Sequence, residues 1–277
     1  MSAIYGPDVK GEYGVAIDEF PRRLRAYFGG EVILDTKQAV LLHETRHLPV
    51  YYVPLADVRH ELLDATDHTT HCPYKGDASY WSVRVGDRVA ENAVWNYPEV
   101  VEGCPDISGY VALYWTSMDH WFEEDEEVFV HPRNPYKRID VLESSRHVRV
   151  EIDGTTVADS SRPRLLFETD LPVRYYLPAL DVRLELLTAT ATSTACPYKG
   201  TARYWSVTVD DTTYDDIVWG YDAPLPEVGK IARLMCFFNE KVDIHVDDEL
   251  QARPLSPWSV DREPANLEDT AALSTSD

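Results

Sequence analysis

The feature that most constrains the fold of this chain is an internal duplication. Shifting the sequence by 124 residues places residues 22–97 onto 146–221 without a gap, and 35 of these 76 positions are identical. Beyond this window the alignment shifts by four, so that Ala112 meets Ala232 and residues 98–103 belong to a longer loop in the first copy. A period this long corresponds to a whole domain and not to a solenoid repeat. The chain therefore has to build one domain twice.

The duplication sets the expected domain organisation. A chain of 277 residues is long enough for each copy to bury its own core. An acidic and then proline-rich segment separates the copies. We expect an N-terminal extension (1–21), a first β domain (22–128), a linker and lead-in (129–145), a second β domain (146–253) and a disordered acidic tail (254–277).

Within each copy the local pattern is that of antiparallel strands. Gly29-Gly30 separates two apolar segments, and Asp153-Gly154 takes its place in the second copy. Such dipeptides supply the positive φ angles of tight hairpin turns. Further hairpins are expected around Gly86-Asp87 and Asp210-Asp211, and the alternation over 182–186 predicts a strand. No segment keeps a helical period, so we expect two mainly β domains with little helix.

Charge and composition exclude several classes of partner. The chain has 26 Lys and Arg against 48 Asp and Glu, a net charge of −22, and no basic stripe. Nucleic-acid and anionic-membrane partners are therefore not expected. No signal peptide or membrane-spanning apolar run is visible. Four cysteines without a CxxC pair indicate reduced thiols and a cytoplasmic protein.

The strongest motif is Cys-Pro-Tyr-Lys-Gly, which occurs at 72–76 and again at 196–200. Proline favours an extended conformation for the cysteine before it, and the glycine allows a turn that brings the lysine near. An ammonium group beside a cysteine stabilises the thiolate, which is the nucleophilic form. The candidate catalytic residues are therefore Cys72, Lys75, Cys196 and Lys199. The alternative is a small apolar cysteine beside a solvated lysine.

Further candidates come from residues that both copies share. Glu44 and Glu168 follow apolar strand residues and are candidates for proton transfer, although each could be an ordinary glutamate at a strand end. Arginine and glutamate two apart on a strand suggest a structural ion pair, or a clamp for a carboxylate substrate. The tryptophans could be core residues or pocket walls. The candidate ligand-binding residues are Tyr52, Arg59, Tyr74, Trp81, Trp95, Tyr176, Arg183, Tyr198, Trp205 and Trp219.

A metal site is not expected. His60, His68 and His71 precede Cys72 at spacings that resemble a ligand set, but their counterparts are Leu184, Thr192 and Ala195. A site essential to the domain should occur in both copies. We expect neither a metal nor another cofactor.

The assembled motifs resemble the domain of unknown function 427 family. The similarity covers both copies and rests on these segments: Ala158-Asp159-Ser160, Glu168, Tyr176–Val182, the Cys-Pro-Tyr-Lys-Gly motif, the Tyr-Trp pair, the Trp-x-Tyr strand and Ile231–Leu234. The first copy departs at Leu34-Asp35-Thr36.

The resemblance implies a small fold of antiparallel sheets that lean together like a tent, with a pocket beneath. Relatives of that fold often hold zinc on two CxxC pairs, which this sequence lacks, so zinc should be absent. A nucleotidyltransferase label has been attached to the family. The sequence does not support it, because it contains neither a glycine-rich phosphate loop nor a convincing metal-carboxylate motif.

Three functions stay open from the sequence. The first is an enzyme that acts on a small metabolite through a pocket in each domain. The second is a non-catalytic small-molecule binding module that uses the same side chains. The third is an interaction scaffold, in which the two domains form an intramolecular pseudo-dimer. A reactive thiol in a pocket favours the first, an inert thiol in a pocket the second, and lysines that point to solvent the third.

Overall fold

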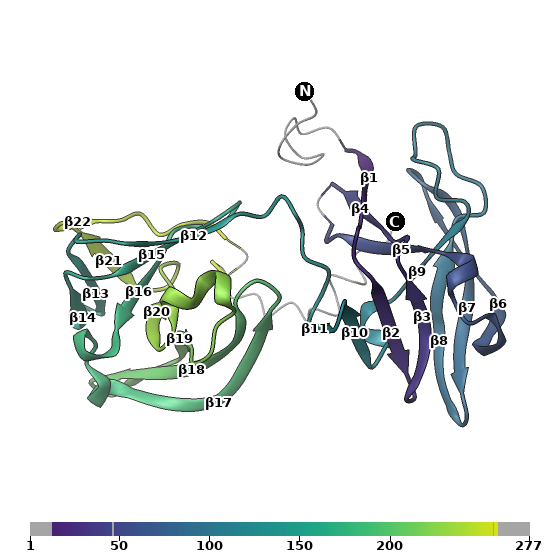
Figure 1. The fold of residues 1–277 in the computed structure, drawn as a ribbon. Coiled ribbons are helices and arrows are strands. Elements are labelled where there is room, and N and C mark those ends of the chain that lie inside the picture. The colour runs from purple at the N-terminus through teal and green to yellow at the C-terminus, as the bar shows by residue number, and fades with distance from the viewer. Residues whose placement is uncertain (1–12, 46, 257, 260–277) are drawn as a thin grey trace. The chain divides into compact units, whose positions relative to one another are not determined.

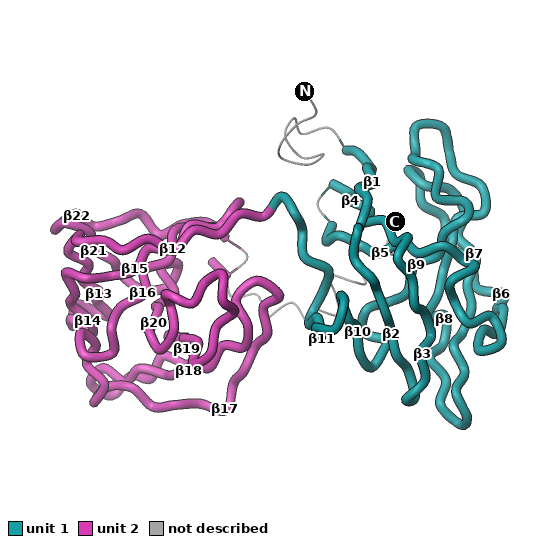
Figure 2. The backbone as a smooth tube through the Cα atoms, viewed as in Figure 1, with its two compact units in different colours: residues 1–136, 265–277 teal, residues 137–264 magenta. Residues whose placement is uncertain are grey.

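The computed structural model describes residues 13–45, 47–256 and 258–259. These residues divide at Tyr136 and Lys137 into two compact units, which we call unit 1 and unit 2 and describe separately (Figure 2). Of the predicted terminal segments, residues 1–12 of the extension and 260–277 of the tail lie outside the described residues.

Unit 1 consists of two antiparallel sheets (Figure 1). A seven-stranded sheet has the order β1-β4-β5-β9-β8-β7-β6, and a four-stranded sheet has the order β11-β10-β2-β3. Two short 3₁₀ turns, η2 (Leu55–Asp57) and η3 (His60–Leu62), join two strands of the seven-stranded sheet, and a third, η4 (Trp115–Ser117), lies where the chain passes to the four-stranded sheet. The strands are β1 (Val15–Glu19), β2 (Leu24–Phe28), β3 (Glu31–Thr36), β4 (Val40–Glu44), β5 (Val50–Pro54), β6 (Leu63–Cys72), β7 (Gly76–Val85), β8 (Arg88–Asn96), β9 (Tyr110–Leu113), β10 (His120–Glu123) and β11 (Glu126–Val128).

Unit 2 repeats this topology strand for strand, with the orders β12-β15-β16-β20-β19-β18-β17 and β14-β13-β21-β22. Its 3₁₀ turns are η5 (Ala179–Asp181), η6 (Leu184–Leu186) and η7 (Pro226–Ile231). The strands are β12 (Ile139–Glu143), β13 (Val148–Ile152), β14 (Thr155–Ser160), β15 (Arg164–Glu168), β16 (Arg174–Pro178), β17 (Leu187–Cys196), β18 (Gly200–Val209), β19 (Thr212–Tyr221), β20 (Leu234–Phe237), β21 (Asp243–Val246) and β22 (Glu249–Leu250). The prediction of two mainly β domains built on one plan is confirmed.

The predicted hairpins are present. Gly29 and Gly30 have φ angles of +61° and +83° and join β2 to β3, while Asp153 and Gly154, at +48° and +75°, join β13 to β14. Two consecutive positive φ angles match the right-handed twist of the strands they join. The hairpins β7–β8 and β18–β19 turn at 86–87 and 210–211, as predicted.

Two local predictions are wrong. The strand expected over 182–186 is interrupted by η6, because the chain turns there to enter the long hairpin of β17 and β18. The register shift of four after Tyr97 is also wrong. Ala112 pairs with Tyr52 and Cys236 with Tyr176, so the offset of 124 continues. The loops 98–109 and 222–233 therefore have the same length.

The two copies also begin earlier than the sequence suggested. Strand β1 lies in the predicted N-terminal extension and pairs with β4, and β12 lies in the predicted linker and pairs with β15. They form one edge of each seven-stranded sheet. The long strands β6 and β17 form the other edge.

Each seven-stranded sheet has two apolar faces. The inner face packs on the four-stranded sheet, and in unit 1 this core contains Leu24, Tyr51 and Trp121. The outer face of the same sheet carries a second cluster around Tyr52, Tyr80 and the loop that follows β8. Because side chains alternate along a strand, Tyr51 and Tyr52 serve these two different cores.

Candidate functional site

The motif cysteines lie at the outer-face clusters: Cys72 packs against the cluster of unit 1, and Cys196 lies near Tyr204 and Tyr221 of the matching cluster in unit 2. The tip of the long hairpin, between β6 and β7 in unit 1, carries this motif. We define site 1 as Glu44, Tyr52, Cys72, Lys75, Tyr80, Trp95 and Tyr97, and site 2 as Glu168, Tyr176, Cys196, Lys199, Tyr204, Trp219 and Tyr221.

An ion pair between the motif lysine and a distant glutamate lies at the centre of each site. Lys75 Nζ donates to Glu44 Oε2, and both side chains are buried, at 8% and 9% exposed. Glu44 ends β4, which three strands separate from β7 in the sheet order. The contact therefore requires the seven-stranded sheet to curl around its outer face, in agreement with a tent-like fold.

Unit 2 makes the same contact. Lys199 Nζ lies 2.5 Å from Glu168 Oε2, and these side chains are 13% and 6% exposed. Both lysines and both glutamates were expected from the sequence to take part in chemistry, but their pairing with each other was not predicted. Two buried opposite charges cost desolvation energy, so such a pair contributes little net stability.

The sites differ in what covers the glutamate. In unit 1 the Tyr13 hydroxyl donates to Glu44 Oε1, and the Tyr13 ring stacks on Tyr74 with centroids 3.7 Å apart. The residue that corresponds to Tyr13 in unit 2 is Lys137, whose Nζ donates to the Thr169 carbonyl instead. Among the described residues, only Lys199 bonds the Glu168 carboxylate.

Aromatic side chains form the rest of each site. Tyr52 and Trp95 meet edge to face, and in unit 2 the Trp219 indole donates to the Tyr176 hydroxyl at 3.1 Å. Lys75 Nζ also lies 5.8 Å from the centre of the Tyr97 ring. Burial raises the pKa of Tyr52 and Tyr97 far above the ordinary value, and the neighbouring Glu44 charge adds to the shift. These phenols therefore stay protonated and can donate hydrogen bonds.

The motif cysteines are partly exposed free thiols at the edge of these clusters. The Cys72 thiol is close enough to the Tyr52 and Tyr97 hydroxyls to influence both. Cys196 stands in the same relation to Tyr221. A thiol, a carboxylate and an ammonium group are thus gathered in each unit.

Several predicted site residues lie elsewhere. Trp81 and Trp205 pack on the inner core and therefore face away from Trp95 and Trp219. Tyr74 is exposed on the surface of site 1, and Tyr198 is partly buried at the same position in unit 2.

The paired arginines also lie apart from the sites. Arg59 bonds Glu61 at 2.7 Å and Glu31 at 2.8 Å, and Arg183 bonds Glu185 at 2.8 Å. All of these side chains are exposed, and the arginines precede 3₁₀ turns and not strand residues. The structural ion pair expected from the sequence is therefore formed, and its members bond to one another on the surface.

Several members of the sites were not predicted from the sequence. Tyr80 and Tyr204, like Tyr97 and Tyr221, are identical between the copies, and that identity was the available signal. No such signal existed for Tyr13, because this residue lies outside the window in which the two copies align.

Unit 2 contains a second buried ion pair that unit 1 lacks. Arg174 donates to both Glu240 oxygens at 2.6 Å, and its guanidinium lies 5.3 Å from the Trp219 ring centre and 5.4 Å from that of Trp258. Ser256 also donates to Glu240. Burial opposes ionisation of Glu240, but these hydrogen bonds outweigh it and lower its pKa. The offset of 124 places Val50 where Arg174 stands.

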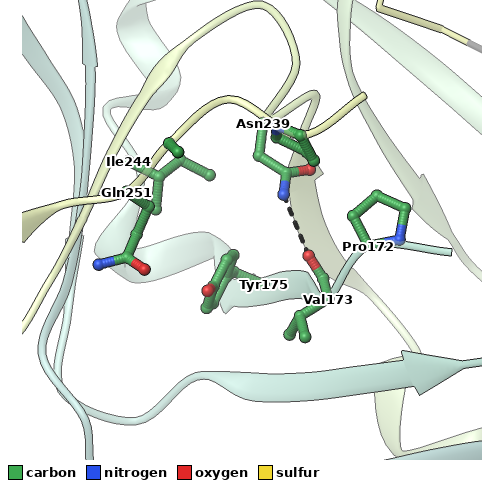
Figure 3. A pocket seen from close by; sticks show the side chains of 8 residues that line it. Pro172, Val173, Tyr175, Asn239, Ile244 and Gln251 are labelled. Carbon is green, nitrogen blue, oxygen red and sulfur yellow. Dashed lines mark hydrogen bonds between the residues drawn. The ribbon is translucent and has the colours of Figure 1, made fainter. Parts of the chain in front are cut away.

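A small cavity of about 180 Å³ lies in unit 2, apart from site 2 (Figure 3). The Asn239 side chain donates to the Val173 carbonyl at its wall. The lining residues are Pro172, Val173, Tyr175, Asn239, Ile244, Gln251, Ala252 and Pro254. Ligand pockets usually measure ~300–1,000 Å³, so this cavity suits only a very small molecule.

Metal binding and membrane insertion are two further functions to consider for the described residues. No group of three or more His, Cys, Asp or Glu side chains is arranged to hold a metal ion within this part of the chain. None of its helices has the length and apolar character that crossing a bilayer requires.

Comparison with known proteins identifies the family. The family model described as "Domain of unknown function (DUF427)" matches residues 16–124 and again 140–248. The chain belongs to this family. Each DUF427 match begins within β1 or β12 and includes every residue of its site. A search of curated proteins found no match. The tandem DUF427 arrangement is thus established, and the chemistry of its sites has to be argued from their geometry.

Proposed function

We propose that each DUF427 unit is an enzyme site for a small metabolite, in which the motif cysteine attacks an electrophilic carbon such as that of a carbonyl or an amide. The observation that carries the proposal is the buried Lys–Glu pair, whose glutamate lies near the same tyrosine as the partly exposed motif cysteine in both units, Tyr97 in unit 1 and Tyr221 in unit 2. Other residues around the motif differ between the two copies, for example Asp77 in unit 1 and Thr201 in unit 2.

The pair supplies what a cysteine nucleophile needs. Glu44 or Glu168 accepts the thiol proton as a general base, and the positive charge of the lysine stabilises the thiolate. The protonated tyrosines can then donate to the oxygen of the attacked carbon, where negative charge develops. Buried ion pairs add little stability, so a purely structural role explains their presence in both copies less well.

Site-resolved alkylation tests this proposal. The folded chain is treated with iodoacetamide at pH 7, and modification of each cysteine is followed by peptide mass spectrometry. We expect Cys72 and Cys196 to react faster than the same cysteines in denatured chain. Glu168→Gln should slow the alkylation of Cys196 and leave the alkylation rate of Cys72 unchanged. Labelling only after denaturation would show that both cysteines are structural and would refute the proposal.

A non-catalytic binding module is the second candidate, and the cavity of unit 2 favours it. None of the residues that line this cavity belongs to site 2. Gln251→Trp should fill it and abolish ligand-induced stabilisation of unit 2 in a screen of small metabolites, without changing alkylation of Cys196. Stabilisation that survives this substitution would locate the ligand elsewhere.

A further inference from the structure

Site 1 has a second, partly exposed cysteine at a position where unit 2 has none, whereas the second cysteine beside site 2, Cys236, is fully buried. Cys104 lies in the loop between β8 and β9 and packs in the same outer cluster as Cys72. The position 124 residues later is Val228, which is buried. Both loops share three equivalent backbone hydrogen bonds, with donors Lys75, Val101 and Cys104 in unit 1 and Lys199, Leu225 and Val228 in unit 2. Otherwise the loops differ, since eleven of their twelve residues are not identical and unit 2 forms η7 there.

Three backbone hydrogen bonds connect Cys72 to Cys104. The Lys75 amide donates to the Cys72 carbonyl, the Val101 amide to the Lys75 carbonyl, and the Cys104 amide to the Val101 carbonyl. Gly76, which pairs with Cys72 across the ladder, lies directly against the loop, since a Cβ at that position would be 2.7 Å from the Glu99 carbonyl oxygen. The loop is therefore held against the hairpin tip that bears Cys72.

The two thiols have different surroundings. Burial raises the pKa of the Cys104 thiol, and the Cys72 and Glu44 charges raise it further, although Lys75 opposes them. Cys104 therefore remains a thiol at neutral pH. We assign removal of the Cys72 proton to Glu44 of the ion pair, since both Cys72 and Glu44 lie near Tyr97. This difference suits Cys72 for attack and Cys104 for a second, resolving step.

We propose that Cys72 and Cys104 form a redox couple that is oxidised by hydroperoxides, an activity that unit 2 lacks. The Cys72 thiolate attacks the terminal oxygen of ROOH, which releases ROH and leaves a sulfenic acid. The Cys104 sulfur then attacks the Cys72 sulfur and loses its proton, and the hydroxyl leaves as water. The hydroperoxide is reduced by two electrons, and the thiols are oxidised to one disulfide. This inference rests on the proposed nucleophilic role of Cys72.

Unit 2 provides the internal comparison. Val228 cannot resolve a sulfenic acid on Cys196. The other cysteine of unit 2, Cys236, is fully buried, and burial raises its pKa to about 12. Oxidation of Cys196 should therefore stop at the sulfenic acid or proceed to higher oxides, whereas Cys72 should be protected as a disulfide.

The experiment treats the full chain with one equivalent of hydrogen peroxide, blocks free thiols and maps the peptides without reduction. We expect a Cys72–Cys104 disulfide, with Cys196 trapped by dimedone. Cys104→Val, which copies unit 2, should abolish the disulfide and give dimedone labelling at Cys72. Val228→Cys should create a disulfide with Cys196. Circular dichroism verifies that both variants are folded.

The outcomes separate this inference from the proposed function. If iodoacetamide labels Cys72 rapidly but peroxide gives no Cys72–Cys104 disulfide, the redox couple is refuted and the nucleophile stands. If Cys72 is inert to iodoacetamide and to peroxide, both the redox couple and the proposed nucleophilic function are refuted. A disulfide that forms equally fast in Glu44→Gln would refute the assigned role of the ion pair in the oxidation.

Discussion

Lys199 Nζ lies 2.5 Å from Glu168 Oε2 although strands β16, β20 and β19 separate β15 from β18 in the sheet. The contact joins two ends of a curled sheet, and the Lys75–Glu44 pair does the same in unit 1. Its two partners should depend on each other energetically, because removal of one leaves a buried charge without compensation.

The first prediction concerns this dependence. Lys199→Met should destabilise unit 2 by about 3–5 kcal/mol, whereas Lys199→Met combined with Glu168→Leu should cost much less, since no charge is then left unpaired. The exposure of Cys236, which is fully buried in the fold, to a thiol reagent over a urea series reports the unfolding of unit 2. Equal losses in the single and double variants would contradict the prediction.

A second prediction compares the two motif glycines. Gly76 and Gly200 have φ angles of +110° and +95°, so alanine should cost each unit about 1–2 kcal/mol. Gly76→Ala should cost more than Gly200→Ala, because its Cβ would lie 2.7 Å from the Glu99 carbonyl oxygen, against 3.5 Å to that of Ala223. Urea unfolding of the two variants measures the difference. The reverse order would mean that the loop of unit 1 yields more easily than its contacts suggest.

A third prediction uses the ion pair that only unit 2 possesses. Arg174→Val, which copies the residue of unit 1, should destabilise unit 2 by about 3–5 kcal/mol, because Glu240 is left buried and unpaired. Adding Glu240→Thr, the residue at the equivalent position 116, should restore most of the loss. Thiol exposure of Cys236 again provides the measurement. Without any restoration, the pair would act mainly through its packing against Trp219.

The fourth prediction concerns pH. His43 is buried 3.1 Å from Asp18, and burial lowers its pKa below 6.5 even though Asp18 opposes the shift. The unfolded chain therefore binds this proton more readily than the folded chain. Unit 1 should lose stability as the pH falls below about 6.5 towards the folded pKa. His43→Phe, which copies Phe167 of unit 2, should remove this part of the pH dependence in urea titrations at pH 7.5 and 5.5. If the variant loses as much stability between pH 7.5 and 5.5 as the parent protein, other groups cause the pH dependence.

The fold could be predicted from the sequence wherever local chemistry determines it. Turn dipeptides such as Gly29-Gly30 require positive φ angles, and the duplication made each hairpin visible twice. The region after β8 could not be aligned correctly, because few identities remain there and only strand pairing, as between Tyr176 and Cys236, restores the offset of 124.

The candidate sites were only partly predictable for a related reason. The sequence indicated Cys72, Lys75 and Glu44 separately, because each is identical in the second copy. Their meeting depends on the curvature of a seven-stranded sheet, which no local pattern reveals. Trp81 and Trp95 belong to one hairpin but lie one residue out of register, since Trp95 pairs with Tyr80 and Trp81 with Val94, and they therefore face opposite sides of the sheet. The face that a strand residue presents changes with such a shift of one residue.

The open edge of unit 2 has a consequence for handling the protein. Strand β17, from Leu187 to Cys196, contains no charged residue and has a free edge within the described sheet, whereas β6 carries Asp64 and Asp67. Charges on an edge discourage intermolecular strand pairing, and long uncharged edges invite it. Aggregation of concentrated samples should therefore begin at unit 2, and a lysine in place of Thr192 would improve colloidal stability without touching either site.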